Sequence, residues 1–182
     1  EPVCKIIVMA NQKGGVAKTS STRNLAYSLA ELGKKVLAVD FDPQTNLTIS
    51  FGVAPAALQE TAASLMMKLV MDEALPEKES CILNIGKVDL LPSKKTLTVA
   101  EVNLLIERKD DCLAKLLAPL RADYDYILVD TGPSLGSLTI NAFTAADEII
   151  IPVDPELFAL VGLKELTETI SKIKQNLNPK VE

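Results

Sequence analysis

Short runs of apolar residues recur along the chain and predict buried β-strands. Four of these runs are dense in β-branched residues and lack the strict alternation of half-exposed strands, and they span residues 5–10, 35–39, 126–129 and 148–153. A continuous apolar pattern of this kind is typical of strands that helices cover on both faces.

A helical pattern follows the first of these strands. Over residues 18–32 three leucines lie at spacings of four and three and form one apolar stripe, namely Leu25, Leu29 and Leu32. Gly33 comes directly afterwards, where a glycine commonly caps the C-terminus of a helix. The pattern therefore predicts a helix that packs on the sheet and ends before Gly33.

A longer helix is predicted over residues 156–177. Its apolar positions form a second stripe, made by Leu163, Leu166, Ile170, Ile173 and Leu177. Asp154 can cap its N-terminus, and Pro155 is tolerated in a first helical turn. The stripe is too short for a coiled coil, so we expect this helix to pack against the sheet.

The middle of the chain predicts shorter elements. Helical patterns cover residues 61–71, 99–107 and 111–117, and short strands are indicated at 82–85 and 88–91. The first of these helices carries three methionines, which we expect to fill gaps in the core, namely Met66, Met67 and Met71. Strands that alternate with helices imply right-handed βαβ units, so the predicted fold class is α/β, a mostly parallel sheet with helices on both faces in a three-layer sandwich.

Composition narrows this picture. The 182 residues suffice for one domain, 48% of them are hydrophobic, and only 4% are aromatic with no Trp, so the core must be aliphatic. The formal net charge of -5 gives no general attraction to nucleic acid.

Cys4, Cys81 and Cys112 are far apart and form no metal-binding pair, which favours buried free thiols. The sequence has no histidine, which removes the usual general base. No apolar run approaches the length of a membrane span, and we expect an intracellular protein without a membrane partner.

The loop after the first strand has the chemistry of a phosphate site. It reads NQKGGVAKTS and leads directly into the predicted helix, so backbone N–H groups and the positive end of the helix dipole point at one place. Gly14 and Gly15 let the backbone curl closely, Lys18 adds a positive charge, and the Thr19 hydroxyl can bind Mg²⁺. The strict P-loop pattern fails at Gln12 and Ala17, so on this loop alone a turn with surface lysines stays an alternative.

Carboxylates elsewhere in the chain favour the phosphate site over that alternative. The segment VLAVDFDPQTNL carries Asp40 and Asp42 at the end of one predicted strand, and YILVDTGPSLG carries Asp130 at the end of another. Ligands of open α/β sheets bind at the carboxyl ends of the strands. We therefore expect the three carboxylates to meet the loop at one edge of the sheet.

These segments together resemble the ParA/Soj branch of the deviant Walker A ATPases, which are relatives of MinD and of the nitrogenase iron protein. The matching stretches extend from residue 9 to residue 166 and are ANQKGGVAKTS, VLAVDFDPQTNL, LLPS, YILVDTGPSLGSLTINAFTAADEIIIPV and ELFALVGLKEL. The Asp-Pro-Gln sequence after the second strand favours ParA over MinD, and no cysteine lies in these loops to suit the iron protein. Residues 1–182 would then form a single P-loop ATPase domain.

The resemblance implies roles for individual residues. The nucleotide would be held by the loop and the first helical turn, through Lys13, Gly14, Gly15, Val16, Ala17, Lys18, Thr19 and Ser20. Lys13, Lys18 and Asp42 would be catalytic, with Lys13 reaching the phosphates of a partner subunit and Asp42 orienting the attacking water. Thr19, Asp40 and Asp130 would form the metal site. The implied cofactors are ATP and Mg²⁺, in a slow ATPase that a partner stimulates.

The chain departs from the family pattern at several points. Ala17 stands where a glycine is usual, Gly132 where a proline is usual, and Val161 where a glutamate is usual. The chain also stops at Glu182, where family members continue through further strands and helices, so we expect that the C-terminal part of the fold is lacking.

The function implied by the resemblance is an ATP-driven dimerisation switch in plasmid or chromosome partitioning. Its partners would be a second copy of the chain, a ParB-like DNA-binding protein and, through the full-length dimer, non-specific DNA, in a nucleoid-associated cytoplasmic location. Two alternatives stay open at this stage. One is a nucleotide-binding interaction module that does not hydrolyse ATP, which Ala17 and the early end of the chain motivate. The other is an enzyme with a second substrate on the same sheet, for which the sequence offers no acceptor residues.

Overall fold

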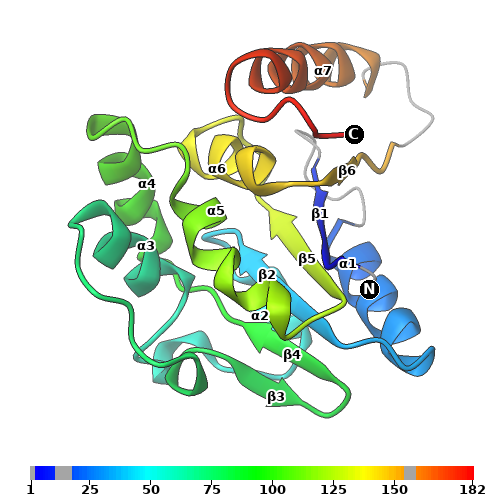
Figure 1. The fold of residues 1–182 in the computed structure, drawn as a ribbon, viewed down its shortest axis with the longest axis vertical. Helices are drawn as coiled ribbons and strands as arrows, with labels where there is room; N and C mark the ends of the chain where they lie inside the picture. Colours follow the sequence, from blue (N-terminus) through cyan, green and yellow to red (C-terminus); the bar gives the residue numbers. More distant parts are fainter. Residues whose placement is uncertain (1–2, 11–17, 154–158) are drawn as a thin grey trace.

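The computed structural model describes residues 3–10, 18–153 and 159–182, and these form a sheet between two layers of helices (Figure 1). The sheet has six strands in the order β3-β4-β2-β5-β1-β6. Their bounds are Lys5–Met9 for β1, Val36–Phe41 for β2, Leu83–Ile85 for β3, Val88–Leu91 for β4, Tyr126–Thr131 for β5 and Glu148–Ile150 for β6. All neighbouring strands are parallel except β3, which pairs antiparallel with β4. The predicted α/β class with a mostly parallel sheet is confirmed.

Seven α-helices connect and cover the strands. They are α1 (Lys18–Glu31), α2 (Asn46–Ser50), α3 (Ala62–Val70), α4 (Leu97–Ile106), α5 (Cys112–Leu117), α6 (Ser137–Ala145) and α7 (Ala159–Asn176). Short 3-10 turns lie at Pro55–Ala57, Lys78–Ser80 and Pro119–Ala122. The helices predicted over 18–32, 61–71, 99–107 and 111–117 are confirmed within two residues at each end, whereas α2 and α6 were not predicted. The proposed cap at Asp154 and Pro155 and the predicted start of the last helix at residue 156 lie outside the described residues.

The two faces of the sheet bury different sets of side chains because successive residues of a strand point to opposite sides. On β2, Leu37, Val39 and Phe41 enter a large core that α3, α4, α5, α6 and α7 cover. Val36 and Ala38 enter a smaller core, which α1 and α2 cover with Ala26, Leu47 and Phe51. The helices therefore enclose the sheet on both sides, as expected.

The structure corrects several predicted core positions. Leu32 is 75% exposed, because α1 turns Lys18, Thr22 and Ala26 inward and ends at Glu31, before Leu32. Met71 is 61% exposed because it lies just after the last turn of α3. Leu177, which follows the end of α7, is also exposed. These three predictions of burial were wrong because each side chain lies at a helix end.

Other local predictions are confirmed. Gly33 has a φ of 80°, a left-handed conformation that glycine adopts without strain, and it ends α1 as expected. The structure adds a feature that was not predicted, a capping box at the start of α3 in which the Thr61 hydroxyl accepts from Ala63 N while the Ser64 hydroxyl accepts from Thr61 N. The three cysteines, Cys4, Cys81 and Cys112, are buried free thiols.

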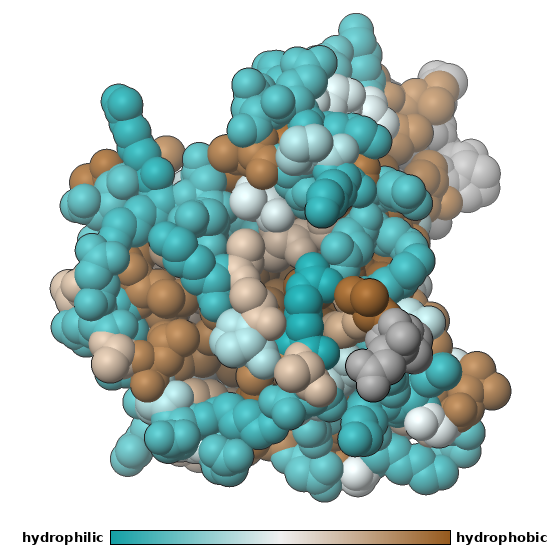
Figure 2. Space-filling view, viewed as in Figure 1, coloured by the Kyte–Doolittle hydropathy of each residue, from teal (hydrophilic) through white to brown (hydrophobic). Residues whose placement is uncertain are grey.

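The face shown in Figure 2 is mainly hydrophilic, with an apolar area around α3 and α5. A groove of about 380 Å³ lies there, and its apolar walls include Leu65, Leu75 and Leu116. In the parts of the chain that the structure describes, no helix has the length and the apolar character needed to cross a membrane.

Candidate functional site

The central strands bring the predicted carboxylates to one edge of the sheet. β5 lies between β1 and β2, all three are parallel, and their carboxyl ends therefore meet. In the register of these strands Asp130 pairs with both Met9 and Asp40. Asp40 and Asp130 thus sit side by side at the ends of neighbouring strands, in the place where α/β sheets bind ligands.

Asp130 contacts the first turn of α1. The Thr19 hydroxyl donates a hydrogen bond of 2.7 Å to Asp130 Oδ2. The other carboxylate oxygen, Oδ1, is buried and has no hydrogen-bond partner among the residues that the structure describes. A buried carboxylate oxygen without a partner is costly, so its acceptor capacity is available to a ligand at this position.

Lys18 is the second group at the start of α1. Its ammonium donates a hydrogen bond of 3.0 Å to the Thr131 carbonyl oxygen, and the residue is only 8% exposed. Burial lowers the pKa of Lys18, while the negative charges of Asp130 and Asp42 raise it. A buried amine near these carboxylates is positioned to meet an anion without first shedding a full hydration shell.

Burial also perturbs the two paired carboxyls. It raises the pKa of Asp130 from 3.8 to about 6, against the opposing effects of the Thr19 hydrogen bond and the Lys18 charge. It raises the pKa of Asp40 from 3.8 to about 7, against hydrogen bonds from Thr48. Carboxyls whose charge is disfavoured in this way are typical of functional sites, because a bound cation would restore the ionised form.

Asp42 is the first residue of the loop that follows β2. Its Oδ1 accepts a hydrogen bond of 3.0 Å from Gln44 N, and the residue is 6% exposed. The same oxygen lies against Gly132, where a side-chain Cβ would come within 3.1 Å of it. A small cleft of about 220 Å³ runs past Asp42 between the Gly132–Ser134 segment and Glu101 of α4. Asp42 therefore lines a space in which a water molecule or a partner side chain could approach it.

The chemistry of this donor set fits a magnesium-bound phosphate group. Thr19 and Asp130 offer oxygen atoms, which Mg²⁺ prefers, and Lys18 offers a charge to the phosphate. Across residues 3–10, 18–153 and 159–182 no group of three or more His, Cys, Asp or Glu side chains forms a metal cage. This is the pattern of Mg²⁺ sites that rely on one or two protein oxygens together with phosphates and waters.

The structure brings together Lys18, Thr19, Asp40, Asp42 and Asp130 from the predicted set. Ser20 is exposed on the first turn of α1. The remaining loop residues, Lys13, Gly14, Gly15, Val16 and Ala17, lie outside the described residues. Sequence reasoning missed two participants, the Thr131 carbonyl that holds Lys18 and the Thr48 hydroxyl that holds Asp40. A backbone oxygen has no sequence signal, and a single threonine within a five-residue helix has almost none.

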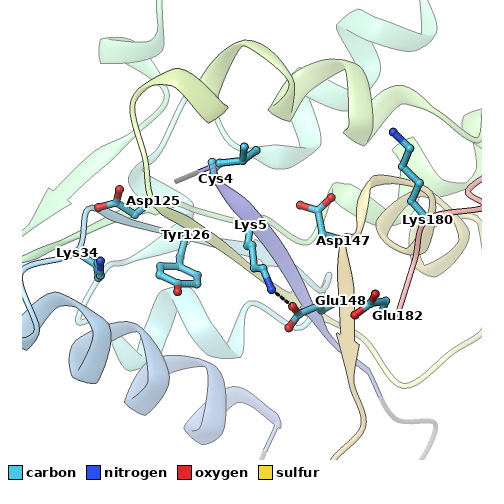
Figure 3. Close-up of a pocket in the computed structure, with 10 residues that line it drawn as sticks. Cys4, Lys5, Lys34, Asp125, Tyr126, Asp147, Glu148, Lys180 and Glu182 are labelled. Carbon is cyan, nitrogen blue, oxygen red and sulfur yellow. Dashed lines mark hydrogen bonds and ion pairs between the residues drawn. The ribbon is translucent and has the colours of Figure 1, made fainter. Parts of the chain in front are cut away.

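A larger hollow lies at the opposite edge of the sheet (Figure 3). It measures about 520 Å³ and is lined by Lys5, Asp125, Tyr126 and Glu148 near the amino ends of the strands. Lys5 pairs there with Glu148, and Arg121 pairs with the adjacent Asp147. Because this hollow lies at the amino ends of the strands, whereas α/β sheets bind ligands at the carboxyl ends, it is not the candidate nucleotide site.

Comparisons with known proteins agree with this geometry. Residues 4–182 match the AAA_31 family, described as an AAA domain. The chain is 41% identical over 181 residues to an uncharacterised protein of Mycobacterium tuberculosis, covering 98% of this chain and 55% of the relative. It is 38% identical over 175 residues to the sporulation initiation inhibitor protein Soj of Bacillus subtilis, covering 96% of this chain and 68% of Soj.

Solved structures show the same fold. One is described as cobyrinic acid a,c-diamide synthase from Mycobacterium smegmatis with bound ADP and magnesium, and it matches with a TM-score of 0.89 and 36% identity over 98% of this chain and 71% of that one. A plasmid partition protein from Borrelia burgdorferi matches with a TM-score of 0.82 and 32% identity over 98% of this chain and 76% of that one.

The chain belongs to the ParA/Soj-like P-loop ATPases of the AAA_31 family. It spans 55% of the mycobacterial relative and about two thirds of Soj.

Proposed function

We propose that this chain is the nucleotide-binding domain of a ParA-type switch that binds ATP with Mg²⁺ and hydrolyses it slowly. The observation that carries the proposal is the hydrogen bond from Thr19 to Asp130 Oδ2, beside the buried ammonium of Lys18 at the start of α1. The other oxygen of Asp130 has no hydrogen-bond partner among the described residues. The positive end of a helix, a lysine and a hydroxyl–carboxylate pair are the parts that a P-loop uses to hold a triphosphate and its metal. The ADP and magnesium of the Mycobacterium smegmatis structure support this choice of ligands.

In this proposal Lys18 holds the phosphates, and Thr19 with Asp130 holds the metal directly or through a bound water. Mg²⁺, when bound, supplies charge neutralisation on the phosphates. Asp42 orients the attacking water, for which its place on the cleft beside Gly132 is suitable. Asp40 stays a predicted member of the metal site. Lys13 and the glycines of the loop, which lie outside the described residues, complete the cradle.

The switch itself is the finer part of the proposal. ATP would bring two copies together, with Lys13 of each copy reaching the phosphates of its partner. The dimer of the whole protein would bind DNA and a ParB-like partner on the nucleoid in the cytoplasm. The family membership and the plasmid partition protein of Borrelia burgdorferi support this direction.

Light scattering during titration with MgATP tests the binding and dimerisation steps. We expect the mass of the full-length protein to double with MgATP, and we expect Lys13→Ala to stay monomeric. A protein whose mass does not respond to MgATP would contradict the dimerisation switch.

Phosphate release tests hydrolysis separately. We expect the parent protein to release phosphate faster than Asp42→Ala at equal nucleotide occupancy. If parent and variant release phosphate at the same background rate while both bind MgATP, the chain is instead a binding module that does not hydrolyse ATP.

A further inference from the structure

Four buried residues beside the candidate site form a closed circuit of hydrogen bonds. They are Asp40, Asp42, Thr48 and Ser93, and we refer to them as the hydroxyl circuit. Asp40, Thr48 and Ser93 are 0% exposed and Asp42 is 6% exposed, so water does not satisfy these groups. The circuit joins three segments of the chain, namely the end of β2, helix α2 and the connection between β4 and α4.

The first half of the circuit runs from Asp40 to Ser93 through the Thr48 hydroxyl. Thr48 Oγ1 donates a hydrogen bond of 2.6 Å to Asp40 Oδ2, and Thr48 N donates one of 2.9 Å to the same oxygen. Because a hydroxyl has a single proton, Thr48 Oγ1 can only accept from its other neighbour. That neighbour is Ser93 N, which donates to it over 2.9 Å.

The second half returns to Asp40 through the backbone of Asp42. Ser93 Oγ donates a hydrogen bond of 2.8 Å to the Asp42 carbonyl oxygen. Asp42 N donates one of 3.2 Å to Asp40 Oδ1. Both backbone groups of Asp42 are thus held by the circuit, and its carboxylate, which accepts from Gln44 N, faces Gly132 and the cleft.

We propose that Thr48 and Ser93 are positioning residues that fix the backbone of Asp42 and so the direction of its carboxylate. Asp42 lies beyond the end of β2, where no sheet ladder holds its N–H and C=O groups. A turn hydrogen bond from Thr45 N to the Asp42 carbonyl oxygen already constrains this backbone. The two hydroxyls add to that constraint, because a buried polar circuit has few alternative arrangements that satisfy all of its members. The effect on turnover rests on the proposed function, whereas the effect on the loop does not.

Amide hydrogen exchange of the nucleotide-free protein tests the circuit without reference to ATP. Thr48→Val keeps the branched shape of the side chain and removes its hydroxyl, which leaves Ser93 N without its acceptor. We expect the Ser93 and Asp42 amides to exchange at least about fivefold faster in Thr48→Val, as the loss of one ordinary hydrogen bond implies. Thr48→Ser keeps the hydroxyl and is expected to restore the slow exchange.

Ser50→Ala is the matched control. Ser50 belongs to the same helix as Thr48 and its hydroxyl donates to the Leu47 carbonyl oxygen, but it lies outside the circuit. We expect this variant to leave the exchange of Asp42 and Ser93 unchanged. Equal acceleration in Ser50→Ala and Thr48→Val would mean that α2 is merely loosened, and unchanged exchange in Thr48→Val would also overturn the proposal.

Steady-state phosphate release tests the consequence for catalysis in the full-length protein. We expect kcat of Thr48→Val and of Ser93→Ala to fall by about 10- to 100-fold, since a misplaced catalytic group can cost this much. The Kd for MgATP should change by less than about threefold, because Lys18 and Thr19 are untouched. Thr48→Ser should recover most of kcat, and a loss of affinity in place of kcat would contradict positioning.

The double variant separates a circuit from two independent contacts. If Thr48 and Ser93 act through one circuit, Thr48→Val combined with Ser93→Ala should lower kcat about as much as the worse single variant does. Multiplied effects would overturn the circuit. If the parent releases no phosphate above the Asp42→Ala background, the proposed hydrolysis fails, and the exchange experiment alone still decides whether the circuit holds the loop.

Discussion

Asp40 and Asp130 occupy paired positions on the neighbouring strands β2 and β5, and each carboxyl reaches a different helix. Asp130 accepts from Thr19 of α1, and Asp40 accepts from Thr48 of α2. Burial raises the pKa of both carboxyls, and the negative charge of Asp130 raises the pKa of Asp40 further. The two carboxyls therefore form a site that favours a cation, and their burial makes the stability of the fold depend on pH.

Asp130→Asn tests the cost of the buried charge. The pKa of Asp130 is about 6 in the folded protein and 3.8 for the ordinary group, so the folded state binds more protons than the unfolded state between these values. Stability is therefore greatest below about pH 4 and falls as the pH rises through about 6. We expect Asp130→Asn to raise the free energy of unfolding at about pH 7.5 by about 1–3 kcal/mol without Mg²⁺ and to flatten this dependence.

Urea denaturation at several pH values makes that measurement. The exposed Asp111, changed to Asn, serves as the control and should leave the pH dependence of the parent intact. A destabilised Asp130→Asn at neutral pH would show that the carboxylate has a partner that compensates its burial.

Lys18→Ala should mainly affect nucleotide binding. Lys18 is buried, and its ammonium donates to the Thr131 carbonyl oxygen. A bound phosphate could replace that carbonyl as the acceptor. We expect the Kd for MgATP to rise by about 10- to 100-fold, since a charge-assisted hydrogen bond is removed. Isothermal titration calorimetry measures this, with Lys34→Ala in the loop after α1 as the control that should keep the affinity of the parent.

Gly132→Ala tests the contact between the Gly132 loop and Asp42. An added Cβ would come within 3.1 Å of Asp42 Oδ1, so the carboxylate must move by a few tenths of an ångström. We expect phosphate release to slow by about 3- to 30-fold with little change in MgATP affinity, because only the orientation of the Asp42 carboxylate changes. In the Asp42→Ala background the same substitution should have no further effect, and an additional loss there would refute the explanation.

Arg121→Met tests a structural ion pair far from the site. The guanidinium donates 2.7 Å and 2.8 Å hydrogen bonds to the Cys4 carbonyl and to Asp147, and Asp147 also accepts from Ile6 N. These bonds tie β1 to the segment before β6. Because the pair is about one third exposed, we expect a modest loss of about 1–2 kcal/mol in the free energy of unfolding. Thermal denaturation measures it, and Lys115→Met, which breaks an exposed pair with Asp111, should cost much less.

The strand cores could be read from the sequence because a doubly covered parallel sheet leaves continuous apolar runs, as at Ile6–Met9 and Ile127–Val129. Helix α6 could not, since it is buried on nearly every side and carries no charged residue, so it has no polar face to mark its period. Helix α2 is only five residues long and gives no periodic signal.

The carboxylates of the site were predictable from topology, because parallel strands must deliver Asp40 and Asp130 to the same edge. Their partners were not. The contact of Thr48 with Ser93 depends on how a loop and a helix 45 residues apart in the chain pack together. The sequence around a single hydroxyl does not indicate which distant group it will bind. The close approach of Gly132 to Asp42 likewise depends on loop geometry rather than on any pattern.

The two cores that flank the sheet are unequal, and the inequality bears on motion. The layer of α1 and α2 is held by a small group of buried residues, whereas five helices share the large core opposite. Local opening costs least where little apolar surface must be exposed, so fluctuations should concentrate in the α1–α2 layer. Because Thr19 belongs to α1, the hydroxyl proposed to hold the metal lies in the layer where we expect the larger fluctuations.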